Sequence, residues 1–221
     1  MESKIFVFGD IHGCYLTFRT LFEKCKIQKQ DSIYLLGDYI DRGPRSKQTL
    51  DFIFNIILEG YNVYPVKGNH EQMLLDTLIS EENEYSWRYI NGGEMTLLSF
   101  KVKNAKEIPS IYLNWIGSLP FYYELEKYVI VHAGLNLHKD NPFEDTDAMI
   151  WTRDRYYDKS KFSKKIIIGH TPTPLDIIEA SLRENIIFLD GGCVYAYNPL
   201  LGNLCALELS EMRLYVQHYL G

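Results

Sequence analysis

The residues of this sequence best suited to chemistry are short polar clusters beside glycine, each at the end of an apolar, β-rich run. The clusters are Gly9-Asp10-Ile11-His12-Gly13, Gly37-Asp38, Gly68-Asn69-His70-Glu71, His132-Ala133-Gly134 and Gly169-His170. In α/β proteins functional side chains gather at the carboxyl edge of a sheet, and glycine lets the chain turn sharply there. We therefore expect one set of side chains to converge in space: Asp10, His12, Asp38, Asn69, His132 and His170.

This set has the composition of a metal site. Carboxylate, imidazole and amide oxygen suit borderline divalent ions such as Mn²⁺, Fe²⁺ or Zn²⁺. The set contains no cysteine, which argues against a structural thiolate site. Six ligands are more than one open catalytic ion needs, whereas two ions that share a carboxylate would use them all. Asp38 is the predicted bridge, because its strand is expected to be the central one of the sheet.

The stretch IYLLGDYIDRGPRS, residues 33–46, adds two further groups to the predicted metal site. Arg42 carries a planar guanidinium that matches phosphate oxygens, so it is predicted to face an anion attracted by the metals. Asp41 is predicted to hydrogen-bond His70 and fix its tautomer. Glu71 is interpreted as an orienting or helix N-terminal charge rather than a ligand. Asp190 is interpreted as a residue that shapes its glycine-containing loop, with contact to a metal-bound histidine as the alternative.

The elements that must position these residues follow an α/β pattern. Near-continuous apolar runs predict strands buried on both faces, and helical spacing appears between the early runs, at Phe18–Cys25 and, after Ser46 as N-cap, at Leu50–Ile57. Strand–helix alternation in the first 70 residues predicts right-handed βαβ units. Residues 71–118 are predicted to be helical with loops, and the closely spaced strands of the last third to form a second sheet or an antiparallel extension. We expect one domain over residues 1–221.

Composition narrows the classes of partner. The formal net charge is −6, which argues against binding to a nucleic-acid duplex or an anionic membrane. No apolar run approaches the about 20 residues that span a bilayer. The N-terminus enters a strand pattern at once, so we expect no signal peptide and a cytoplasmic location. The cysteines, which lack C-x-x-C spacing, are expected to be reduced, buried thiols: Cys14, Cys25, Cys193 and Cys205.

Taken in order, GDIHG, GDYIDRG, GNHE, HAG and GH resemble the motifs of the calcineurin-like metallophosphoesterases, within the phosphoprotein phosphatase superfamily. The segments INGGEMT (90–96) and MIWTRDR (149–155) are similar to the bacterial and phage branch. That branch contains small serine/threonine protein phosphatases, some of dual specificity, and the symmetrical diadenosine tetraphosphate hydrolases. The resemblance implies an α/β fold, a sandwich of two mixed β-sheets flanked by helices.

The resemblance also implies a role for each matching residue. Asp10 and His12 would bind the first metal and Asp38 would bridge. The second metal would be completed by Asn69, His132 and His170, with Asn69 also near the substrate phosphate. His70 would be the general acid, paired with Asp41, and the substrate phosphate would be bound by Arg42 and a second arginine, for which Arg153 matches better than Arg155. Tyr195 is a candidate neighbour of the site.

The sequence leaves the substrate open. The favoured interpretation is a serine/threonine protein phosphatase with two divalent ions, manganese first, with iron or zinc as alternatives. Hydrolysis of symmetrical dinucleoside tetraphosphates is the second interpretation, a nuclease a distant third, and a non-catalytic phosphate-binding scaffold the non-enzyme alternative. The partner is thus a phosphorylated protein or a small phosphoester, and the sequence does not give the oligomeric state.

Other candidate side chains have a simpler interpretation. Trp87, Tyr89, Tyr122 and Tyr123 could line a substrate groove, but packing is favoured for all of them. His138 and His218 lie in no motif and are interpreted as ordinary surface or strand residues.

Overall fold

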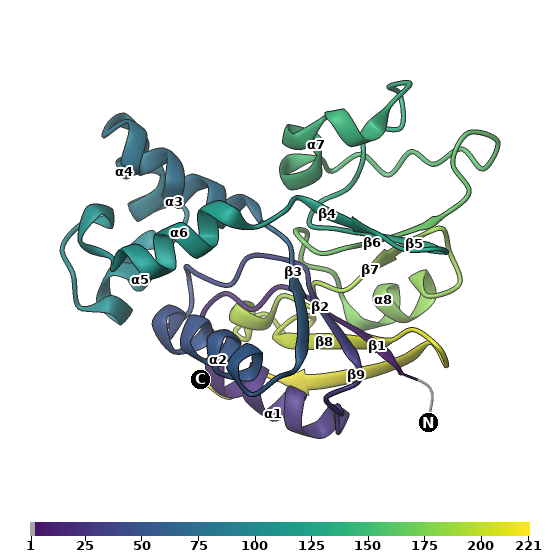
Figure 1. The fold of residues 1–221 in the computed structure, drawn as a ribbon, viewed down its shortest axis with the longest axis horizontal. Helices are drawn as coiled ribbons and strands as arrows, with labels where there is room; N and C mark the ends of the chain where they lie inside the picture. Colours follow the sequence, from purple (N-terminus) through teal and green to yellow (C-terminus); the bar gives the residue numbers. More distant parts are fainter. Residues whose placement is uncertain (1–2) are drawn as a thin grey trace.

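Two β-sheets form the centre of the computed structural model, which describes residues 3–221 (Figure 1). The first sheet has the order β3-β2-β1-β8-β9, with bounds Asn62–Pro65, Ser32–Leu35, Ile5–Phe8, Asn203–Glu208 and Arg213–His218. The second has the order β4-β5-β6-β7, with bounds Tyr122–Glu124, Tyr128–Val131, Lys165–Ile168 and Ile186–Phe188. β1, β2 and β3 run parallel, as do β5, β6 and β7, whereas β8, β9 and β4 join antiparallel. Both sheets are mixed, which confirms the expected fold class.

Helices cover the sheets on their outer sides. α1 (Tyr15–Cys25) and α2 (Ser46–Leu58) lie together against the first sheet, and α7 (Thr146–Trp151) lies beside the second (Figure 1). α8 (Leu175–Ser181) precedes β7. Residues 69–118 form a helical layer beside both sheets, made of α3 (Asn69–Ile79), α4 (Glu82–Tyr85), the π-helical turn η1 (Ser86–Ile90), α5 (Gly93–Phe100), η2 (Ala105–Glu107) and α6 (Ser110–Ser118). Two short 3₁₀ turns lie later in the chain, η3 (Pro142–Glu144) and η4 (Cys193–Tyr195).

The apolar strands are buried on both faces, as their sequence predicts. Val7 of β1, Ile130 of β5 and Ile167 of β6 belong to one buried cluster, so this cluster joins the inner faces of the two sheets. Phe6 and Phe8, the neighbours of Val7, point instead into the cluster under α1 and α2. Because successive side chains on a strand face opposite sides, one β1 strand serves both cores. The shared core thereby fixes the position of one sheet relative to the other.

Two local predictions need correction, and the sequence patterns missed one strand. Ser46 is the first residue of α2 rather than its N-cap, and its hydroxyl accepts the backbone N–H of Asp41 at 3.1 Å. The strand before Asp38 is β2, whereas the central strand of that sheet is β1. The short strand β4, Tyr122–Glu124, was not predicted; it pairs antiparallel with β5 at the sheet edge.

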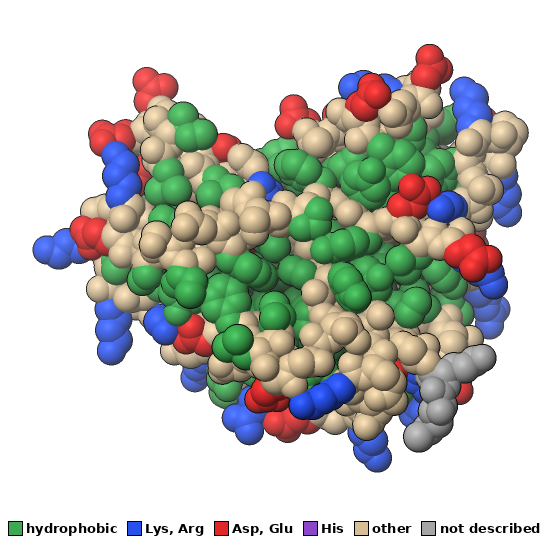
Figure 2. Space-filling view, in the orientation of Figure 1, with side chains coloured by type: hydrophobic (Ala, Val, Ile, Leu, Met, Phe, Trp, Pro, Cys, Tyr) green, Lys and Arg blue, Asp and Glu red, His purple; other side chains and the backbone are tan. Residues whose placement is uncertain are grey.

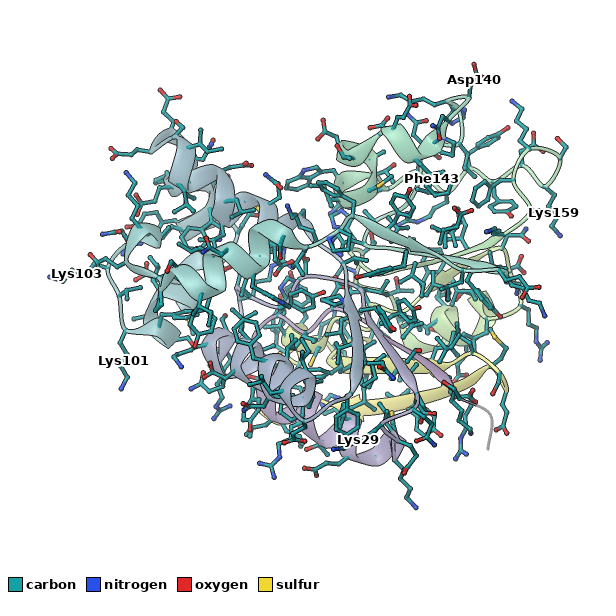
Figure 3. The ribbon with its side chains drawn as sticks, viewed as in Figure 1. Lys29, Lys101, Lys103, Asp140, Phe143 and Lys159 are labelled. Carbon is teal, nitrogen blue, oxygen red and sulfur yellow. The ribbon has the colours of Figure 1, made fainter. Side chains whose placement is uncertain are left out.

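Among the described residues, no helix combines the length and the apolar character needed to cross a bilayer. Long charged side chains such as Lys101, Lys103 and Lys159 project outward at the periphery (Figure 3). The viewed face is hollowed at its upper margin, between the surfaces over α4 and over α7 (Figure 2). Cys14, Cys25, Cys193 and Cys205 are free and buried, as expected.

The core between the sheets predicts a large difference between two isoleucine substitutions. Ile167→Ala removes a fully buried side chain from β6 and should lower the free energy of unfolding by about 2–5 kcal/mol. Ile177→Ala, in α8 at 49% exposure, should change it by no more than about 0.5 kcal/mol. Urea unfolding of both variants followed by circular dichroism tests this, and equal losses would contradict the assignment of the inter-sheet core.

Candidate functional site

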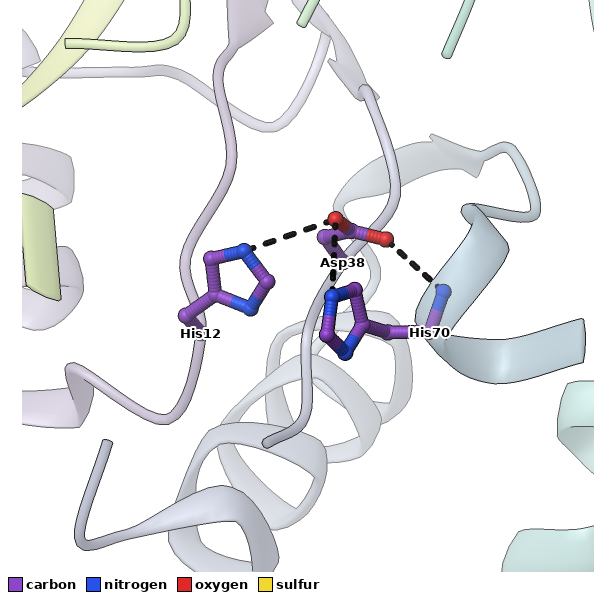
Figure 4. A group of neighbouring side chains, drawn as sticks. All are labelled: His12, Asp38 and His70. Atoms are coloured by element: carbon purple, nitrogen blue, oxygen red, sulfur yellow. Dashed lines mark hydrogen bonds and ion pairs between the residues drawn. The ribbon is translucent and has the colours of Figure 1, made fainter. Parts of the chain in front are cut away.

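The Asp38 carboxylate is the centre of the site, at the carboxyl edge of the first sheet. Its Oδ2 lies 3.4 Å from Nε2 of His12, and its Oδ1 lies 3.5 Å from Nε2 of His132. His12 follows β1 and His132 follows β5, so the two oxygens of one carboxylate face histidines from different sheets. Figure 4 shows Asp38 between His12 and His70. This geometry would let one carboxylate contact two cations.

A second group of donors adjoins Asp38. Oδ1 of Asn69 lies 2.9 Å from Nε2 of His132 and 3.0 Å from Nδ1 of His170, and the two histidine nitrogens are 3.2 Å apart. Asn69 begins α3 and His170 follows β6, so these donors come from both sheet edges. Asp38, His132 and His170 place their donor atoms within 4.8 Å of one another, as do His12, Asp38 and His70.

Backbone carbonyls fix the tautomers of two of these histidines. Nδ1 of His12 lies 3.0 Å from the carbonyl oxygen of Ile40, and Nδ1 of His132 lies 2.7 Å from that of Leu36. A proton on each Nδ1 satisfies these carbonyls and leaves Nε2 as a lone pair directed at Asp38. Carbonyl partners of this kind are typical of metal-binding histidines.

Asp10 is buried beside this group and is only partly satisfied by hydrogen bonds. Its Oδ2 accepts the backbone N–H of His170 at 2.9 Å, whereas its Oδ1 has no hydrogen-bond partner within residues 3–221. A Cβ on Gly169 would lie 1.9 Å from that Oδ1, so only glycine lets the carboxylate sit there. Burial, followed by the charges of Asp190 and Asp38, raises the pKa of Asp10. A cation at this position would satisfy the orphaned oxygen and offset the clustered carboxylates.

The pKa shifts of the central side chains favour the protonation states in which they can bind a metal. Burial lowers the pKa of His12, of His132 and, to about 3, of His170, so their imidazoles are neutral near pH 7. Burial alone would raise the pKa of Asp38, but the neighbouring histidines hold it below its ordinary value. Neutral imidazoles around an ionised carboxylate are the protonation states that metal binding requires.

His70 differs from the other histidines of the site. Its Nδ1 lies 2.8 Å from Oδ2 of Asp41, as predicted, and its buried Nε2 has no hydrogen-bond partner among the described residues. That Nε2 is 4.0 Å from Oδ2 of Asp38. Burial lowers the pKa of His70, but Asp38 and Asp41 outweigh it and the net shift is upward. An imidazole with a raised pKa and a free nitrogen in the site can carry a proton.

The loops that carry these residues are strained. Positive φ angles occur at His12 (45°), Asp38 (51°), Asp41 (70°), Arg42 (66°) and His170 (67°), a region that non-glycine residues rarely adopt. Glu71 holds the central loop in this form: its carboxylate accepts the backbone N–H groups of Asp38 and Tyr39, each at 2.8 Å, and of Gly68 at 3.0 Å. Glu71 thus orients this loop and also lies in the first turn of α3, which agrees with both interpretations. Asp190 shapes its loop by accepting the N–H of Gly192 at 2.8 Å.

The arginines lie around the same group. Nη1 of Arg42 is 2.7 Å from Nε2 of His12, and its guanidinium carbon is 5.6 Å from the centre of the Tyr195 ring. Arg155 is held by the hydroxyl of Thr171 at 3.0 Å and by the carbonyl of Ala133 at 3.3 Å. Arg153 has an exposed side chain. The contacts of Arg155 place it beside His170, whose pKa is lowered mainly by burial, with smaller contributions from the charges of Arg153 and Arg155. The second phosphate-binding arginine stays a prediction.

Sequence interpretation missed two contacts to Asp41. Trp87 is buried as expected, but its indole N–H also donates to Oδ2 of Asp41 at 2.8 Å, and the Thr96 hydroxyl donates to Oδ1 at 2.6 Å. The INGGEMT segment, noticed only as a mark of similarity, was the signal for them because it contains Thr96 and follows Trp87.

The predicted packing role was wrong for one aromatic residue, since Tyr89 is 61% exposed. Tyr122 and Tyr123 pack as predicted, against Phe143 and against Tyr34 with Tyr64. His138 pairs with Asp154 at the surface, and His218 is an exposed residue of β9, both as interpreted.

Comparison with known proteins agrees with this geometry. The calcineurin-like phosphoesterase family model matches residues 3–205. The chain is 27% identical to an asymmetrical bis(5'-nucleosyl)-tetraphosphatase PrpE of Geobacillus sp., over 95% of this chain and 91% of that protein. It is 33% identical to serine/threonine-protein phosphatase 2 of Salmonella typhimurium, over 68% of each.

A solved structure shares the fold. The cold-active protein-tyrosine phosphatase of a psychrophilic Shewanella superposes with a TM-score of 0.64 at 19% identity, covering 99% of this chain and 78% of that one. Together with the match of the family model and the phosphatase relatives, the site shows that this chain belongs to the calcineurin-like phosphoesterase family and is a hydrolase of phosphate esters.

Proposed function

We propose that this chain hydrolyses phosphomonoesters with two bound divalent cations, and that its substrates are proteins phosphorylated on serine or threonine. The observation that carries the proposal is the free Nε2 of His70, buried 4.0 Å from the central carboxylate of Asp38. Alkoxides such as those of serine and threonine are poor leaving groups, so their departure benefits most from a proton donor.

The donor set supports two cation positions. Asp10, His12 and Asp38 would hold one cation, and Asp38 would share the other with Asn69, His132 and His170. When bound, the cations would supply a water nucleophile of lowered pKa and polarise the phosphoryl oxygens. Manganese, iron and zinc all suit these ligands, and manganese is the proposed ion.

Side chains of this chain would bind the phosphate and donate the proton. Arg42, beside His12, would offset charge on the phosphoryl oxygens through its guanidinium. As the bond between phosphorus and the leaving oxygen breaks, His70 would give its Nε2 proton to that oxygen. Asp41 would hold the Nδ1–H side of His70 and stabilise the imidazolium before the transfer. Arg153 is the proposed second phosphate ligand, and Asn69 would lie near the phosphate.

A second candidate function has its own observation. Trp151 is 43% exposed and meets the ring of His170 edge-on at 6.3 Å, while Tyr195 lies over Arg42 and next to Tyr197, which is 84% exposed. Exposed aromatic rings on two sides of the site could stack on nucleobases. A dinucleoside tetraphosphate is therefore the alternative substrate.

Metal binding should stabilise the protein through Asp38. Mn²⁺ at a concentration of 100 times its Kd should stabilise the wild type by about 2.7 kcal/mol, measured as a rise in Tm over the EDTA-treated protein. Asp38→Asn weakens the central ligand and should lose most of that rise. Asp140→Asn, at the periphery in Figure 3, is the matched control and should retain it. An undiminished rise in Asp38→Asn would remove Asp38 from the metal site.

The role of His70 predicts a separation between chemistry and metal content. His70→Asn should lower turnover of a phosphoserine peptide by about 10²–10⁴-fold, because the leaving alkoxide is no longer protonated. Bound manganese, measured by mass spectrometry, should stay near the wild-type amount. Parallel losses of turnover and manganese would instead make His70 a ligand, as its closeness to His12 and Asp38 also permits.

Side-by-side substrates decide between the two candidate functions. The manganese-loaded protein should have a higher kcat/KM for a phosphoserine or phosphothreonine peptide than for diadenosine tetraphosphate. Preference for the dinucleotide by orders of magnitude would establish the alternative. Failure to turn over either compound or 4-nitrophenyl phosphate would favour a phosphate-binding scaffold.

A further inference from the structure

The carboxylate of Asp41 is fully occupied by three side chains. Its Oδ2 lies 2.8 Å from Nδ1 of His70 and accepts the indole N–H of Trp87 at the same distance. Its Oδ1 accepts the hydroxyl of Thr96 at 2.6 Å. Asp41, Trp87 and Thr96 are all at least 99% buried, so water cannot replace these bonds. The orientation of the carboxylate is therefore set by Trp87 and Thr96 as much as by His70.

Thr96 also holds the backbone of Asp41. The hydroxyl of Thr96 accepts the Asp41 N–H at 2.9 Å and lies 3.0 Å from the hydroxyl of Ser46. Asp41 has a φ of 70°, a conformation that costs energy for a residue with a side chain. Contacts from outside its own loop are needed to keep such a backbone in place, and Thr96 provides one to the backbone N–H and one to the carboxylate of Asp41.

Close packing fixes Trp87 in turn. Trp87 lies in η1, a π-helical turn of a kind often found at functional sites. A Cβ on Gly93 would lie 2.4 Å from the indole ring, so glycine is what lets α5 begin directly against it. The neighbouring Gly92 accepts the backbone N–H of Arg42 at 3.1 Å. Trp87, Gly92 and Gly93 thus join the helical layer to the loop that carries both Asp41 and Arg42.

We propose that Trp87 and Thr96 are positioning residues for proton donation: they fix the Asp41 carboxylate so that His70 presents Nε2 to the leaving-group oxygen. The inference rests on the proposed role of His70 as proton donor and extends it to two residues that touch neither substrate nor metal. The indole N–H of Trp87 and Nδ1 of His70 meet the same oxygen of Asp41, so a change at position 87 reaches His70 through that carboxylate. Phenylalanine at position 87 would keep most of the apolar contact and lose only the N–H donor and part of the ring.

Leaving-group dependence distinguishes positioning from packing. Phenyl phosphate needs protonation of its leaving oxygen much more than 2,4-dinitrophenyl phosphate, whose leaving group departs as a stable anion. Trp87→Phe should lower kcat for phenyl phosphate about tenfold and kcat for the dinitrophenyl ester less than about twofold, with manganese content unchanged. Trp115→Phe in α6 is the matched control, since Trp115 packs on Tyr39 and Phe54 in the same layer, and both rates should stay within about twofold.

Thr96 gives an independent pair of variants if Trp87→Phe does not fold. Thr96→Val keeps the shape without the hydroxyl and should show the same selective loss for phenyl phosphate. Thr96→Ser restores the hydroxyl and should recover the rate to within about threefold of wild type. A loss in Thr96→Val that is equal for both esters, or no recovery in Thr96→Ser, would overturn the positioning role.

His70→Asn is measured on the same two esters to separate this inference from the proposed function. If His70→Asn reduces both rates equally, the proton-donor role itself fails. If His70→Asn is selective for phenyl phosphate but Trp87→Phe and Thr96→Val lower both rates equally or neither, only the positioning role fails. Selectivity in all three variants supports both.

Discussion

The site depends on one buried carboxylate, Asp38, placed where the edges of two sheets meet. Its two oxygens face His12 and His132, which come from different sheets. A buried charge is costly unless it is paired, and Asp38 is 2% exposed among neutral imidazoles, so a bound cation would stabilise its carboxylate. Glu71 holds the backbone of Asp38 in its strained form through two N–H groups of that loop. Displacing Asp38 would therefore disturb both groups of metal-binding side chains together.

The packing of the two sheets brings the metal-binding side chains of both sheets close together. The cluster that contains Val7, Ile130 and Ile167 locks one sheet against the other. Near the site the connection becomes polar, since Nδ1 of His132, after β5, lies 2.7 Å from the carbonyl of Leu36, after β2. The same contact that joins the sheets also sets the tautomer of a metal-binding histidine. Stability and chemistry are thus supported by the same contacts at this edge.

The helical layer, residues 69–118, also helps to fix the geometry of the site. It supplies Asn69 and His70 at the start of α3, and further along the chain it contacts Asp41 through Trp87 and Thr96. Two buried donors of this layer, the Trp87 indole and the Thr96 hydroxyl, are thus directed at one carboxylate. The insertion of this layer between β3 and β4 therefore affects the geometry of the site as well as the burial of apolar surface.

The sequence by itself determined the strand ends, the early helices and the set of polar residues that converge, because short apolar runs and glycine-flanked motifs are local signals. It also predicted the contact between Asp41 and His70. Only the tertiary structure decided that β1 is central, that the Ser46 hydroxyl binds the backbone of Asp41, and that Trp87 and Thr96 contact Asp41. Those outcomes depend on which distant segments pack together, and in the sequence Trp87 and Thr96 lie 46 and 55 residues from Asp41 with no periodic pattern to connect them.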